Sequence, residues 1–88
     1  MSANDYGRFN HTLQECRDGL RRDAAEFGER YELLSKALEL LDEEESLVRR
    51  WFDLYMAVID EDSYMKWGRE MDCLEKEIER NWYTRHNG

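Results

Sequence analysis

The chain contains no proline, and only five glycines are spread over its 88 residues. Because these two residues interrupt helices most strongly, their scarcity favours helix along most of the chain. Residues 1–5 lack the basic and apolar regions of a secretory signal, and no apolar run approaches the roughly 18 residues of a membrane span. We therefore expect a cytoplasmic protein without a membrane partner.

Residues suited to catalysis or metal binding are also few. Cys16 and Cys73 match no CxxC or zinc spacing, so we expect free thiols, with Cys16 in the core. A disulfide or redox switch is the alternative. His11 and His86 belong to no His-Glu-x-x-His or Glu-x-x-His motif, and we expect both to be solvated. With no phosphate-binding loop or activated nucleophile, we predict no enzymatic activity, no metal and no cofactor.

Charge of one sign dominates part of the chain, whose formal net charge is -8. Between residues 39 and 62, nine acids accompany only Arg49 and Arg50, whereas the remainder is nearly balanced. A strongly acidic surface repels phosphate groups, so we expect no direct binding to nucleic acid or to anionic lipid.

Apolar side chains recur every three or four residues from residue 6 to residue 41, with a four-residue insertion near Ala24. This spacing predicts one long helix over about 4–41. The acids at 42–45 favour a turn and a new helix start, although a continuous helix is the alternative. A second helix is expected over about 43–83, kinked or broken near 60–63, with a frayed tail at 84–88. The repeat consists of Tyr6, Phe9, Leu13, Cys16, Leu20, Ala24, Phe27, Tyr31, Leu34, Leu38 and Leu41.

These elements predict an all-α fold, an antiparallel helical hairpin that forms a single domain over 1–88. The seam of the second helix includes Trp51, Tyr55 and Met65. Apolar residues over 47–59 cover more than one stripe of a helix, so a two-helix hairpin leaves some of them unburied. We therefore expect a homodimer in a four-helix bundle, which would cover Leu40, Phe52, Met56 and Ile59.

The acids and the surplus aromatic residues together favour a non-enzymatic adaptor or inhibitor that binds a protein partner. In a sharper version, the carboxylates occupy the cationic groove of a nucleic-acid-binding protein. In general character, though in no motif, the chain is similar to the small acidic helical inhibitors that viruses use against host nucleic-acid enzymes. The alternative is a structural homo-oligomeric coiled-coil subunit. The predicted partner-binding residues are Glu39, Asp42, Glu43, Glu44, Glu45, Phe52, Met56, Ile59, Asp60, Glu61, Asp62, Tyr64 and Trp67.

Overall fold

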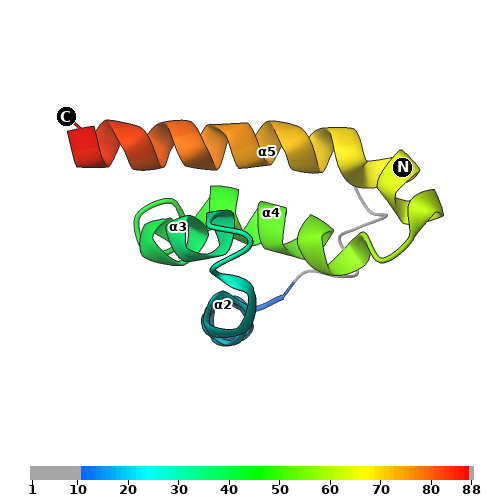
Figure 1. Cartoon of the computed structure of the whole chain (residues 1–88), viewed down its shortest axis with the longest axis horizontal. Coiled ribbons are helices and arrows are strands. Elements are labelled where there is room, and N and C mark those ends of the chain that lie inside the picture. Colours follow the sequence, from blue (N-terminus) through cyan, green and yellow to red (C-terminus); the bar gives the residue numbers. More distant parts are fainter. Residues whose placement is uncertain (1–10, 88) are drawn as a thin grey trace.

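The computed structural model describes residues 11–87, and these residues form helices with no strand (Figure 1). The all-α prediction is thus confirmed for the described part of the chain. Figure 1 shows α5 returning alongside α4 in the opposite direction, with α2 on the side of α4 away from α5. The helices are α2 at Leu13–Phe27, α3 at Leu33–Leu40, α4 at Glu45–Ala57 and α5 at Glu61–Asn87.

The single helix expected over about 4–41 is wrong, because residues 28–32 separate α2 from α3. Gly28 closes α2, and its amide donates to Ala24 O at 2.9 Å. A Cβ at Gly28 would lie 2.3 Å from that oxygen, so glycine permits this tight exit. The break turns α3 so that it packs against both α2 and α5, which one straight helix could not do.

The two later interruptions agree with the sequence. Residues 41–44 form the predicted turn, in which the Glu44 amide donates to Leu40 O at 2.7 Å. The second break lies at 58–60, and Asp60 caps α5: the Ser63 amide donates to Asp60 Oδ1 at 2.9 Å, and the Asp60 amide donates to Ser63 Oγ at 3.0 Å. This reciprocal pair is a capping box. Helix α5 then continues to Asn87, so residues 84–87 are helical rather than a tail.

The core surrounds α4, whose Trp51 is fully buried and stacks on Tyr55 at 4.8 Å between ring centroids. Helices α2, α3 and α5 of the same chain supply its neighbours, so the apolar faces of α4 are mostly covered without a second copy. Cys16 is buried as expected, and Cys73 is exposed. The core consists of Cys16, Leu20, Leu33, Leu34, Ala37, Leu40, Leu41, Val48, Trp51, Phe52, Leu54, Leu74 and Ile78.

Polar side chains join the helices at the edge of this core. The carboxylate of Glu75 on α5 accepts from Trp51 Nε1 at 3.1 Å and from the hydroxyl of Tyr31. Asp23 on α2 accepts from the Tyr55 hydroxyl at 2.8 Å. Burial and these hydrogen bonds raise the pKa values of both tyrosines above the ordinary value. Buried donors therefore have acceptors here, and each link sets the position of one helix against another.

Candidate interaction surface

The predicted partner-binding residues fall into two groups at opposite ends of α4. One group surrounds the turn at 41–44, and the other surrounds the break at 58–60. Helix α4 has 13 residues, which corresponds to a length of about 20 Å at 1.5 Å per residue. The two groups are therefore separate surfaces rather than one acidic face.

The acidic turn is largely neutralised by bases from elsewhere in the chain. Arg17 Nη2 lies 2.7 Å from Asp42 Oδ1, and this guanidinium holds the pKa of Asp42 below its usual value. Glu39 Oε1 lies 3.4 Å from His86 Nε2. Exposed ion pairs contribute little to stability, but they reduce the net charge that a partner would meet. The ion pairs at the turn and at the start of α4 join Asp42 to Arg17, Glu43 to Arg85, and Glu45 to Arg49.

Sequence reasoning missed this compensation because it counted charge along the chain. Arg17 lies on α2 and Arg85 on α5, and both reach the turn only because those helices pack around it. Asn81 also donates to Glu44 Oε1, at 3.4 Å. The acids of the turn consequently hold it against α2 and α5 of the same chain.

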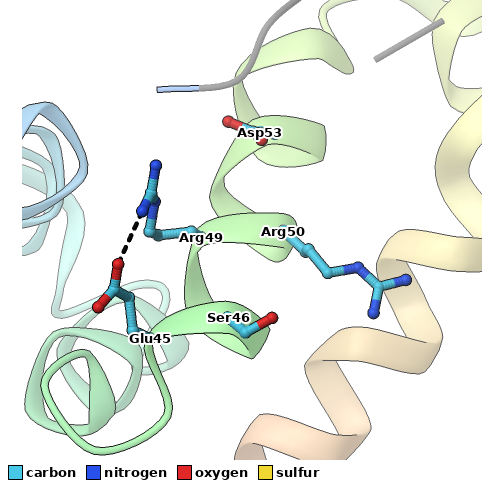
Figure 2. A pocket seen from close by; sticks show the side chains of 5 residues that line it. All are labelled: Glu45, Ser46, Arg49, Arg50 and Asp53. Carbon is cyan, nitrogen blue, oxygen red and sulfur yellow. Dashed lines mark hydrogen bonds and ion pairs between the residues drawn. The ribbon is translucent and has the colours of Figure 1, made fainter. Parts of the chain in front are cut away.

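Beyond the turn, an open pocket of about 410 Å³ lies along α4 (Figure 2). Figure 2 shows Arg49 and Arg50 pointing to opposite sides of the helix. Arg49 donates from Nη1 to Glu45 Oε2 and from Nη2 to His11 O, both at 2.7 Å. Both terminal nitrogens of this guanidinium thus have acceptors within the chain. The pocket is lined by Glu45, Ser46, Arg49, Arg50 and Asp53.

Asp53, at the far end of this pocket, holds the chain at His11. The residue is 4% exposed, and its Oδ1 accepts from the His11 amide at 3.0 Å. His11 Nδ1 lies 2.9 Å from the same oxygen, and its ring meets Phe52 edge-on at 5.0 Å between centroids. The expectation of a solvated His11 is therefore wrong. No local signal could have predicted it, since the two partners are 42 residues apart.

The second group lies at the junction of α4 and α5, at the right of Figure 1. We define the α4–α5 corner as Met56, Ile59, Tyr64 and Met65. Ile59 is 81% exposed and Met65 79%, while Tyr64 is 52% and Met56 39% exposed. Asp60, Glu61 and Asp62 are exposed between them. Large apolar side chains and acids thus share one end of the molecule.

Three side chains near this end lie elsewhere than the sequence analysis predicts. Phe52 is 2% exposed, so its predicted place at a partner surface is wrong. A Cβ at Gly19 would lie 2.6 Å from Phe52 Cζ, so the absence of a side chain at Gly19 leaves space for the ring. Trp67 is half-buried and packs against the core. Met65, assigned to the hairpin seam by its spacing, is exposed instead because the break at 58–60 changes the direction of the chain.

Within residues 11–87, no group of three or more His, Cys, Asp or Glu side chains could hold a metal ion. Over the same range, no helix is both long enough and apolar enough to cross a membrane. No family model, curated protein or solved structure is similar enough to the chain to count as a match.

Proposed function

We propose that this is a non-enzymatic protein that binds another protein through the α4–α5 corner, as an adaptor or inhibitor. The observation that carries the proposal is the exposure of Ile59 and Met65, each about four-fifths open to solvent. Fully burying a side chain of this size contributes about 1.5–3 kcal/mol, so covering two supplies a substantial part of a binding energy. Large exposed apolar side chains that cluster commonly mark interaction sites.

The charge around the corner restricts the partner. Residues 56–65 include three acids and no base. Among the described residues, Glu61 and Asp62 form no ion pair, and Asp60 is engaged by Ser63 of its own helix cap. A partner with an apolar patch and nearby Lys or Arg side chains would complement this surface, because opposite charges steer association and exclude acidic competitors.

The sharper proposal of nucleic-acid mimicry rests on the same end of the molecule. The carboxylates of Asp60, Glu61 and Asp62 would occupy a cationic groove of the target. Asp42, Glu43 and Glu45, by contrast, have arginines of their own chain beside them. Binding that weakens steeply with salt and competes with nucleic acid would support this version, and salt-insensitive binding would contradict it. The proposal includes a cytoplasmic location and no direct contact with nucleic acid or membrane, both of which rest on composition.

The second candidate function is a structural homo-oligomeric coiled-coil subunit, in which the corner meets a second copy of the chain. The exposed Ile59 and Met65 favour it. Two of the four residues that this dimer would cover, Leu40 and Phe52, are already buried within the chain. A symmetric contact would also bring the corner acids of both copies together, and like charges at an interface disfavour association.

A photo-crosslinking experiment separates these functions. A photoreactive amino acid replaces Met65 in one variant and Glu77, an exposed residue farther along α5, in the control. We expect a crosslink to a different protein from position 65 and none from position 77. The same crosslink should form when the purified partner protein is mixed with the variant. A crosslink between two copies at position 65 would support the homo-oligomer, and equal yields from both positions would contradict the proposed surface.

A further inference from the structure

A smaller pocket adjoins the corner, where α2 lies against α4. Its volume is about 250 Å³, below the roughly 300–1,000 Å³ of sites that enclose a drug-sized ligand. Met56 belongs both to this pocket and to the α4–α5 corner, so the two features are continuous. The pocket is lined by His11, Glu15, Asp18, Gly19, Arg22, Phe52 and Met56.

The pocket has apolar residues at its base and an acidic rim. Gly19 carries no side chain, and the buried ring of Phe52 lies against it. Glu15 and Asp18 are exposed on α2 at the rim. Arg22 also lines the pocket, and its Nε lies 3.1 Å from Asp23 Oδ1.

Neutral groups donate hydrogen bonds to both rim acids, and Arg17 of the same helix interacts electrostatically with Asp18. Glu15 accepts from the Thr12 amide at 2.9 Å, and Asp18 accepts from Gln14 Nε2 at 2.8 Å. Both donors are neutral groups and bring no positive charge to the rim. Met56 thus belongs both to a pocket that Glu15 and Asp18 line and to a corner that includes exposed acids at 60–62.

We propose that this pocket receives one large apolar side chain from a basic segment of the partner protein, while the rest of that segment lies across the α4–α5 corner. The inference rests on the proposed function and specifies the chemistry of the partner. Single anchor side chains that fill a pocket dominate many interfaces, and the surrounding contacts exclude water. Amphipathic segments bind in grooves between helices in this way. Lys or Arg beside the anchor would face Glu15 and Asp18.

The test uses the full chain and a library of random 12-residue peptides displayed on phage. We expect selection to enrich peptides with one Leu, Met or aromatic residue flanked by Lys or Arg. For a purified peptide, Asp18→Lys should weaken binding about tenfold, and Ile59→Asp by a similar factor, as expected at a central contact. Glu77→Lys makes the same charge change on the exposed surface of α5 and should leave affinity unchanged.

A second measurement does not depend on a variant. With ¹³C-labelled methionine methyl groups, the selected peptide should shift the signals of Met56 and Met65, while that of half-buried Met71 stays in place. Peptides that shift Met65 alone and tolerate Asp18→Lys would overturn the anchor pocket and leave the corner as the binding site. Enrichment of acidic peptides, or no enrichment at all, would overturn both.

Discussion

Two glycines in helix interiors should respond in opposite ways to the same substitution. Gly19 lies within α2 and Gly68 within α5, and both are buried. Replacing a helical glycine by alanine stabilises a helix by about 1 kcal/mol. Space around the new methyl group then decides the outcome at each position.

At Gly19, a Cβ would lie 2.6 Å from Cζ of Phe52, a ring that is 2% exposed. The ring is packed against the core, so displacing it to admit a methyl group should cost about 1–3 kcal/mol. At Gly68, the Cβ would lie 2.8 Å from Cδ1 of Tyr64, which is 52% exposed and can turn toward solvent. We therefore expect Gly19→Ala to destabilise by about 1 kcal/mol and Gly68→Ala to stabilise by about 0.5 kcal/mol.

Urea unfolding followed by circular dichroism would measure both variants. With a slope of about 1 kcal/mol per molar urea for a chain of this size, the two midpoints should differ by about 1.5 M. Stabilisation by Gly19→Ala equal to that by Gly68→Ala would refute the reasoning, because it would mean that Phe52 is not confined against α2.

Other predictions concern the polar links and the thiols. Glu75→Ala leaves two aromatic donors without their acceptor and should cost about 1–3 kcal/mol in urea unfolding, whereas Glu75→Gln keeps an acceptor and should cost less. Hydrogen bonds from Ser63 lower the pKa of Asp60, so its cap stabilises α5 at neutral pH and is lost as pH falls below the ordinary value of 3.8. Asp60→Ala should consequently lower the melting temperature at pH 7 and have little effect at pH 2, and an equal effect at both would contradict the cap. Cys73 should react at once with an aromatic disulfide reagent, while Cys16, whose pKa burial raises to about 12, should react only on unfolding.

Interactions between neighbours along the chain were predictable from the sequence. Helix content, the turn at 41–44, the break near 60 and the place of Cys16 in the core all follow from caps, helix-breaking composition and the spacing of apolar residues. Each of these signals acts over a few residues, within one or two turns of helix. The exposed Ile59, Tyr64 and acids at 60–62 were also among the predicted partner-binding residues.

Tertiary packing alone decided the rest. Arg17 and Arg85 neutralise the acidic turn from two other helices, and His11 meets Asp53 across 42 residues of chain. The break at 28–32 folds α3 back, and the surrounding helices then bury Phe52, which a two-helix hairpin would have left exposed. Periodicity shows that a side chain lies on an apolar face, but the neighbour that covers it depends on the directions of helices distant in sequence.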